Sequence, residues 1–191
     1  MELVKPTLQL LTEYAKALSQ GWSPDNLRPE VAKEQLDAIG DDPEAFISQF
    51  EDLEAKGEPI LLPDGTCVPR LPGFTRWIWK EGFCGSINMR WQYGTEDLPP
   101  HCLGHVGYAV VPWRRGQGLA SAALVALLPE VRFIGLRYIE LTTSPDNAAS
   151  QRVIEKAGGV LLERFRKSAA YGGAEALRFR ISIVKESAQN S

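Results

Sequence analysis

Apolar residues repeat at helical spacing over the first part of the chain. The positions that share one face near the start are Leu8, Leu11, Ala15 and Leu18. Gly21 can end that helix, and the following pattern predicts a second helix over residues 29–39. Asp42 is placed to cap a third helix, which is expected over about 43–56. Residues 1–58 are therefore predicted to be largely helical.

From residue 59 onward the apolar and aromatic runs become short and are typical of strands. The expected strands cover 74–79, 83–91, 106–111, 138–142, 160–166 and 177–184, and helices are expected over 119–128 and 147–157. Pro129 is expected to end or kink the first of these helices, because proline lacks the N–H that a helix interior needs. Mostly antiparallel strands crossed by two helices indicate an α+β fold, a mixed twisted sheet flanked by helices.

The chain length sets the expected domain organisation. A chain of 191 residues suits one domain, since domains commonly hold roughly 150 residues. We expect a single domain over 1–191, made of a helical part (1–58), a sheet core (59–184) and a terminal tail (185–191).

Charge and hydropathy limit the expected partners. Lys and Arg number 21 against 24 Asp and Glu, a net charge of -3, so no strongly basic face for nucleic acid is predicted. The first residues lack the apolar run of a signal peptide, and no stretch approaches the roughly 18 apolar residues of a membrane span. We expect a cytoplasmic protein without a nucleic-acid or membrane partner.

The cysteines and histidines argue against metal and disulfide chemistry. Cys67, Cys84 and Cys102 are widely spaced, no C-x-x-C pair occurs, and the chain has only two histidines. A disulfide framework and a zinc site are therefore not expected, and no metal ligands are predicted. Three small thiols in a reducing compartment are the simplest interpretation.

The strongest local feature is a strand, a turn and a helix over residues 106–128. The turn reads Pro-Trp-Arg-Arg-Gly-Gln-Gly-Leu-Ala over 112–120, so two glycines and an alanine fall where the helix begins. A helix start presents unpaired N–H groups and the positive end of the helix dipole, which suits a diphosphate. Arg114 and Arg115 add positive charge there. Glycines that serve only tight packing are the alternative explanation of this turn.

This turn resembles the acetyl-CoA-binding signature, Q/R-x-x-G-x-G/A, of the GNAT N-acetyltransferase superfamily, with Arg115, Gly118 and Ala120 at its fixed positions. Gly-Tyr at 107–108 is similar to the I-G-Y of members that acetylate ribosomal-protein N-termini. Residues 142–158, Thr-Thr-Ser-Pro-Asp-Asn-Ala-Ala-Ser-Gln-Arg-Val-Ile-Glu-Lys-Ala-Gly, resemble the family segment D-P-x-N-x-x-S-x-x-V-x-E-K-x-G-F. The segments Gly-Trp-Ser-Pro-Asp-Asn and Gly-Ser-Ile-Asn-Met-Arg resemble a less characterised bacterial subgroup of predicted acetyltransferases.

The resemblance implies a GNAT fold, acetyl-CoA as the cofactor and acetyl transfer to a primary amine. The cofactor-binding residues it implies are Tyr108, Ala109, Val110, Arg115, Gly116, Gln117, Gly118, Leu119, Ala120, Ser121, Asn147 and Ser150. N–H groups of the turn would hold the diphosphate, and the strand before it would pair with the pantetheine arm. An N–H near Val110 would then be the oxyanion donor. Asn147 has a second interpretation, as the N-terminal cap of its helix.

An alkylamine is mostly protonated at pH 7, so a group that accepts its proton is needed. His105 is the first candidate, because it stands where I-G-Y relatives often carry Glu and because its ordinary pKa suits a base. Structural hydrogen bonding by that histidine is the alternative. Glu140 is the second candidate, with a solvated edge charge as its alternative.

Two positions depart from the family pattern. Ile154 stands where many members carry the tyrosine that protonates the leaving thiolate, and Gly159 stands where the family usually has Phe. The absent tyrosine keeps open a second class of function, a non-catalytic acyl-CoA-binding or regulatory domain. A third hypothesis treats the turn as packing and the chain as an interaction module.

The residues expected to bind the acceptor are Trp22, Asn26, Trp79 and Arg90. Their aromatic rings would suit apolar or cationic acceptors. A protein N-terminus, a lysine, a polyamine, an aminoglycoside and a small amino compound are all compatible partners. A homodimer is a further candidate assembly, and the length of the acyl group stays open.

Overall fold

The computed structural model describes residues 1–26, 28–62 and 64–183. The expected tail over 185–191 lies outside the described residues. The helices are α1 (Leu11–Ser19), α2 (Val31–Asp41), α3 (Pro43–Ser48), α4 (Leu119–Ile134) and α5 (Ala148–Lys156). Single 3-10 turns are η1 (Leu8–Leu10), η2 (Pro112–Arg114) and η3 (Ala169–Tyr171).

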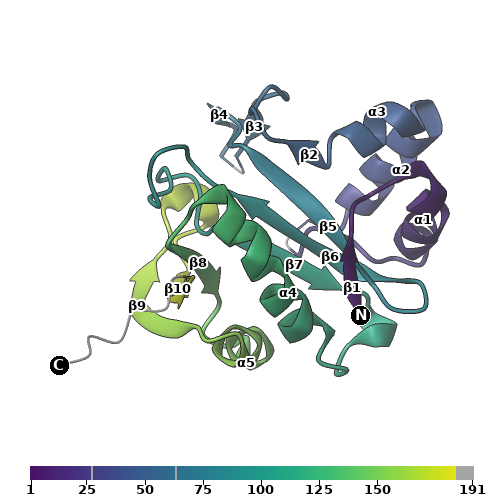
Figure 1. Ribbon diagram of the computed structural model, residues 1–191. Helices are drawn as coiled ribbons and strands as arrows, with labels where there is room; N and C mark the ends of the chain where they lie inside the picture. Colours follow the sequence, from purple (N-terminus) through teal and green to yellow (C-terminus); the bar gives the residue numbers. More distant parts are fainter. Residues whose placement is uncertain (27, 63, 184–191) are drawn as a thin grey trace.

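Two sheets make up the centre of the molecule (Figure 1). The first has the order β1-β5-β6-β7, with β2 also pairing with β5, and all its pairs are antiparallel. Its strands are β1 (Glu2–Val4), β2 (Glu51–Asp52), β5 (Gly73–Trp79), β6 (Phe83–Arg90) and β7 (Val106–Val110). The second has the antiparallel order β8-β10-β9, made of β8 (Tyr138–Thr143), β10 (Glu175–Ser182) and β9 (Val160–Arg166). A small hairpin joins β3 (Ile60–Leu61) and β4 (Cys67–Val68).

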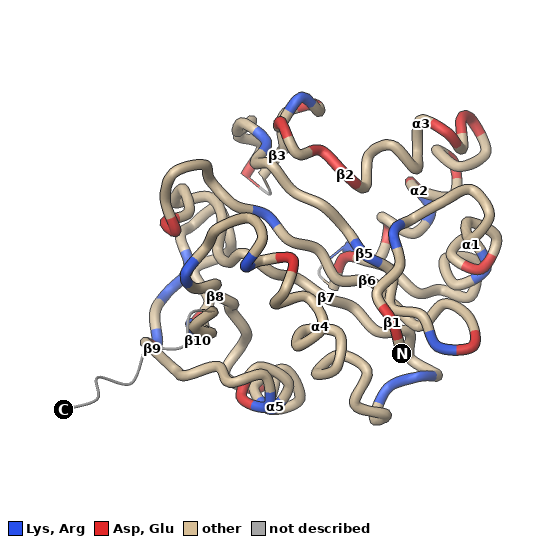
Figure 2. The backbone as a smooth tube through the Cα atoms, viewed as in Figure 1, with Lys and Arg blue, Asp and Glu red and all other residues tan. Residues whose placement is uncertain are grey.

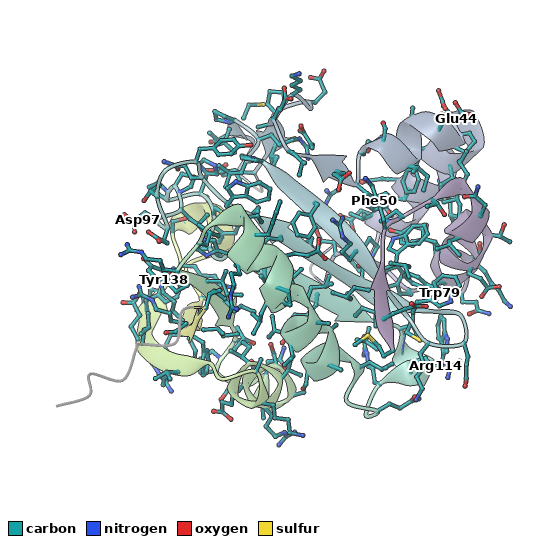
Figure 3. All side chains as sticks on the ribbon, viewed as in Figure 1. Glu44, Phe50, Trp79, Asp97, Arg114 and Tyr138 are labelled. Carbon is teal, nitrogen blue, oxygen red and sulfur yellow. The ribbon has the colours of Figure 1, made fainter. Side chains whose placement is uncertain are left out.

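Apolar residues pack on both faces of the first sheet. One buried cluster joins that sheet to α4, α5 and the second sheet, with Ile87, Leu124 and Ile139 among its fully buried members. A second cluster lies between the opposite face and the N-terminal helices, where Tyr14 stacks on Trp77 with ring centroids 4.7 Å apart. Phe50 lies in this second layer, as Figure 3 shows. Burial of these alternating residues accounts for the α+β fold that the sequence predicts.

The N-terminal part is less helical than its pattern predicts. Asp42 caps α3 as expected, its Oδ1 accepting the N–H groups of Glu44 and Ala45 at 3.1 and 2.9 Å. The expected continuation of that helix to about residue 56 is wrong, because the chain leaves α3 after Ser48 and pairs with β5 as β2. Strand β1, at Glu2–Val4, was not expected either. Both short strands exist through pairing with a distant strand, which local periodicity does not reveal.

Helix α4 continues through Pro129 to Ile134, so the helix does not end at that proline. Proline at this position removes the N–H that would bond to the carbonyl of Val125. Val125 is 49% exposed and Pro129 is exposed as well, so the unpaired carbonyl lies on the solvent side of the helix. Leu127 and Val131 are fully buried beside it, and their packing keeps the helix on the sheet.

Within the described ranges, no helix is both long and apolar enough to cross a membrane.

Candidate active site

The glycine turn before α4 has the geometry of an open cradle. Gly116 and Gly118 have φ values of +75° and +74°, which side chains other than glycine rarely adopt. A Cβ added at either glycine would meet no atom within 4 Å. Gly118 is the N-cap residue of α4, and no side chain caps that helix. Among the described residues the N–H groups at 119–121 have no acceptor, as expected at an uncapped helix start, so they are available to an external one.

The side chains of the turn divide between core and surface. Leu119 is buried under the first turn of α4, whereas Gln117 is exposed and Ala120 and Ser121 are half-buried. Arg115 donates its Nε–H to the carbonyl of Val110 at 3.2 Å, which ties the turn to the end of β7. Figure 2 marks the two consecutive basic residues of this turn, and Figure 3 places Arg114 at its start.

Strand β7 ends the order of the first sheet, so within the described part of the chain one side of its backbone pairs with no other strand. On the β6 side, Arg90 N–H bonds to the carbonyl of His105 at 2.9 Å and Val111 N–H to the carbonyl of Cys84 at 3.0 Å. Antiparallel pairing alternates along a strand, so Tyr108 and Val110 direct their N–H and C=O groups away from β6. These groups face β8, the edge strand of the second sheet. Ala109, paired with Ser86 and buried, directs its backbone toward β6 instead.

The start of α5 lies beside this free edge. Asn147 caps the helix, its Oδ1 accepting the N–H of Ser150 at 3.0 Å, so the capping interpretation of that residue holds. No partner for the Asn147 Nδ2 is found in the described part of the chain. The hydroxyl of Tyr108 lies 2.8 Å from Ser150 Oγ and connects β7 to α5. Burial raises the pKa of that phenol, and the hydrogen bond with Ser150 only partly opposes the shift.

His105 joins the two sheets where β7 begins. Its backbone N–H donates to the carbonyl of Glu140 at 2.8 Å, and its ring Nδ1 accepts the backbone N–H of Glu140 at 3.0 Å. The imidazole thus accepts an N–H group that a backbone carbonyl would accept in a continuous sheet. From that point β7 and β8 belong to separate sheets. The residue is 1% exposed, and burial lowers the pKa of the imidazole while the charge of Glu140 partly opposes this.

This geometry bears on the predicted base. A neutral imidazole has one nitrogen that can accept, and here Nδ1 already accepts from Glu140. Nε2 then carries the proton, and this buried atom has no partner among the described residues. For His105 to take a proton from a substrate, the bond to Glu140 N–H would have to break. The base role stays a prediction, and the observed contacts favour a positioning role.

The carboxylate of Glu140 is held by two guanidinium groups. Arg180 donates to Oε1 at 2.6 Å, and Arg178 donates to Oε2 at 3.2 Å. Arg180 also lies 3.7 Å from the ring centroid of Tyr138 (labelled in Figure 3). Glu140 as a base likewise stays a prediction, in competition with this ion-pair role.

The two departures from the family pattern contact each other. Ile154 is 1% exposed and lies in the core. A Cβ added at Gly159 would lie 2.4 Å from Ile154 Cγ2 and 2.8 Å from the Ile154 carbonyl oxygen. The isoleucine at 154 therefore occupies the space that a side chain at 159 would need.

Gly159→Ala is expected to destabilise the fold by about 1–3 kcal/mol, because an added methyl group at a filled site forces its neighbours apart. Denaturant unfolding measures this difference. The double variant Gly159→Ala with Ile154→Leu serves as the test of cause, since leucine lacks the Cγ2 methyl group that the added Cβ would meet. Recovery of part of the lost stability is expected, and no recovery would contradict the contact as the reason.

A cavity of about 390 Å³ opens on the face of the first sheet that the N-terminal helices cover. Asn88 and Arg90 lie on its floor, Phe50 follows α3, and Tyr171 reaches in from the β9–β10 connection. The Tyr171 hydroxyl donates to the carbonyl of His101, which closes one side of the cavity. Burial raises the pKa of Tyr171, and the nearby charge of Arg90 opposes this shift.

The predicted acceptor residues are not all at this cavity. Arg90 lines it, and Asn26 donates its Nδ2–H to the carbonyl of Tyr108 at 3.2 Å, at the free edge of β7. Trp22 is 2% exposed in the aromatic cluster of the N-terminal helices, and Trp79 packs against the same cluster (Figure 3); neither lines the cavity. For these two tryptophans the structure supports core packing.

Sequence reasoning missed Asn88 and His101 as lining residues. Asn88 could have been predicted, because alternation along Gly-Ser-Ile-Asn-Met-Arg places it on the same strand face as Arg90. His101 follows a proline-bearing loop that carries no periodic signal.

Comparison with known proteins identifies this arrangement. Residues 67–160 match the family model described as an acetyltransferase (GNAT) domain. The Microcin C7 self-immunity acetyltransferase MccE, solved with acetyl-CoA and AMP, superposes with a TM-score of 0.61 at 13% identity over 94% of this chain and 91% of that one. RimL, a ribosomal-protein α-N-acetyltransferase solved with coenzyme A, gives 0.59 at 12% identity over 94% and 92%. An aminoglycoside acetyltransferase solved with coenzyme A and kanamycin gives 0.54 at 15% identity over 95% and 94%. No curated protein sequence matches the chain.

The glycine cradle at a helix start and the unpaired strand edge between two sheets lie in the fold that the chain shares with these acetyltransferases. Residues 67–160 form a GNAT acetyltransferase domain, as the resemblance of the turn predicted. The predicted α+β fold and enzyme class are thereby confirmed. The solved structures, all far below 25% identity, share the fold alone and assign no acceptor.

Proposed function

We propose that this protein moves an acetyl group from acetyl-CoA to a primary amine by direct attack of the amine on the thioester. The observation that carries the proposal is the free edge of β7, which leads directly into the uncapped glycine start of α4. One continuous set of main-chain donors is thus available for a diphosphate and for the chain attached to it.

The residues present suit the donor. N–H groups over 116–121 would bind the diphosphate at the positive end of the α4 dipole. The backbone of Val110 and Tyr108 would pair with the amides of the pantetheine arm. Asn147 can donate from its Nδ2, because only its Oδ1 is used for capping. Ser150 lies beside these groups through its contact with Tyr108.

The free edge also indicates the oxyanion donor. The thioester lies at the end of the pantetheine arm, farther from the diphosphate than the amides are. Tyr108 is farther from the glycine turn than Val110 along β7, so we propose its N–H for the thioester oxygen in place of the N–H near Val110 that the resemblance implies. Such a donor stabilises the transition state by about 3–4 kcal/mol in acyl-transfer enzymes.

The chemistry needs little from side chains. The amine nitrogen forms a bond to the carbonyl carbon, the C–S bond breaks, and the amine proton passes to a base or to water. A thiol with a pKa of about 8.5 leaves readily as thiolate, so the isoleucine at 154 does not prevent turnover. Asn26, at the Tyr108 carbonyl, lies where the acceptor must approach this edge.

The test is release of free thiol from acetyl-CoA on addition of amines from several classes: peptides, lysine, polyamines, aminoglycosides and small amino compounds. Calorimetric titration with acetyl-CoA accompanies it. Binding together with amine-dependent thiol release supports the enzyme. Binding without release from any amine favours the non-catalytic acyl-CoA-binding domain, and absence of binding would contradict both.

A cytoplasmic location, a single domain over the chain and a homodimer remain predictions. The two ends of the proposed site come from one chain, so the proposal does not depend on a second subunit.

A further inference from the structure

We propose that the acceptor is an amine that carries an acidic group, a carboxylate or a phosphate, and that Arg90 binds this group beside the site of acetyl transfer. The inference rests on the proposed function and names its substrate class. It comes from the position and the charge balance of the cavity on the first sheet.

Arg90 lies next to the strand at which transfer is proposed. Its Nη2 donates to Asn88 Oδ1 at 2.8 Å. Gly107, opposite Asn88 on β7, leaves the space for both side chains. A Cβ added at Gly107 would lie 3.2 Å from Asn88 Oδ1 and 3.3 Å from Arg90 Nη2. The guanidinium therefore rests over the residue that precedes Tyr108.

The other charges at the cavity already have partners. Arg70 lies 4.0 Å from a carboxylate oxygen of Asp52 and donates to the carbonyl of Glu58. Asp52 also accepts the N–H groups of Lys56 and Gly57. Asp25, on another wall, accepts the N–H of Arg28 at 3.1 Å. In the ranges that the structure describes, no carboxylate lies within 4.0 Å of Arg90.

An unpaired guanidinium on the floor of a cavity is suited to an anion. Carboxylate and phosphate accept two parallel N–H groups from arginine, and such charge-assisted bonds exceed neutral ones in strength. Phe50, Leu62 and Leu71 are apolar residues that line the same cavity. A volume of about 390 Å³ lies in the range of sites for small molecules. An amino acid, an amino phosphate or the acidic end of a peptide has this combination of groups.

Matched pairs of amines test the proposal. Phenylalanine is compared with phenethylamine, and phosphoethanolamine with ethanolamine, by kcat/KM for thiol release. The full-length protein is expected to prefer the acidic member of at least one pair by about tenfold or more, and the favoured pair separates carboxylate from phosphate. In Arg90→Gln this preference is expected to disappear, mainly because KM for the acidic amine rises. Arg90→Lys is expected to recover part of the preference.

Arg70→Gln is the matched control, because it removes the other guanidinium of the same cavity, and it is expected to keep the preference. Calorimetry of the acidic amines with the CoA-bound protein gives a readout that does not need turnover. If no amine is acetylated but Arg90→Gln weakens binding of the acid, the proposed function fails, whereas the role of Arg90 in binding an acidic group stands. An equal preference in Arg90→Gln and the unaltered protein, or a preference for neutral amines, would overturn it.

Discussion

Gly118→Glu is expected to abolish detectable acetyl-CoA binding while the protein stays folded. The substitution places a carboxylate at an uncapped helix start, where the proposed diphosphate would meet both its bulk and its negative charge. We expect the dissociation constant to rise by at least about a hundredfold, or about 2.7 kcal/mol. Calorimetric titration measures the change, and thiol release should be lost in parallel.

Gly135→Glu is the matched control for this variant. Gly135 ends the same helix with a φ of +95°, and a Cβ there also meets no atom within 4 Å. Both variants therefore carry similar strain of about 1–2 kcal/mol from a side chain in left-handed backbone. Only the change at residue 118 should affect the cofactor. Activity that survives Gly118→Glu, or equal loss in both variants, would disprove the assigned cradle.

Local sequence was sufficient to predict the cofactor end of the site. Two glycines at a helix start permit the left-handed backbone that this turn adopts, and the order of strand, turn and helix is short-range information. The cap at Asp42 and the end of α1 before Gly21 were predictable for the same reason. These features depend on groups within a few residues of one another.

The acceptor end depends on contacts between distant segments and was less predictable. Trp22 and Trp79 resemble binding residues by composition, yet they complete the aromatic packing under the N-terminal helices. Ile154 and Gly159 come together only because the chain turns back at the end of α5. From the sequence, the missing tyrosine at 154 and the missing phenylalanine at 159 therefore appeared to be unrelated. Arg90 was predicted, but its lack of a carboxylate partner became visible only with the cavity around it.

His105 shows how one residue can satisfy two predictions that only an experiment separates. The motif predicts a base, and the fold uses its Nδ1 to hold Glu140 where the sheets part. Asparagine offers a way to distinguish them, since its Oδ1 can accept the same N–H but does not titrate.

His105→Ala is expected to lower kcat/KM by about a hundredfold or more, since it leaves the buried Glu140 N–H without an acceptor at a cost of about 1–3 kcal/mol and loosens the strand that holds the thioester. If the role is positioning, His105→Asn should recover most of this activity. If the imidazole is the base, His105→Asn should be as impaired as His105→Ala, by the 10²–10⁴-fold typical of general bases.

The pH dependence supplies the independent readout. Burial lowers the pKa of His105, so the unfolded chain binds this proton more readily than the folded one does. The free energy of unfolding should therefore rise with pH from the depressed pKa up to about 6.5, with a slope of at most about 1.4 kcal/mol per pH unit, and this contribution should vanish in His105→Asn. A base role adds a fall of kcat/KM below the same depressed pKa, which His105→Asn would remove. Loss of the stability slope with retention of the kcat/KM profile would show that the histidine holds the two sheets together and leaves the proton to another acceptor.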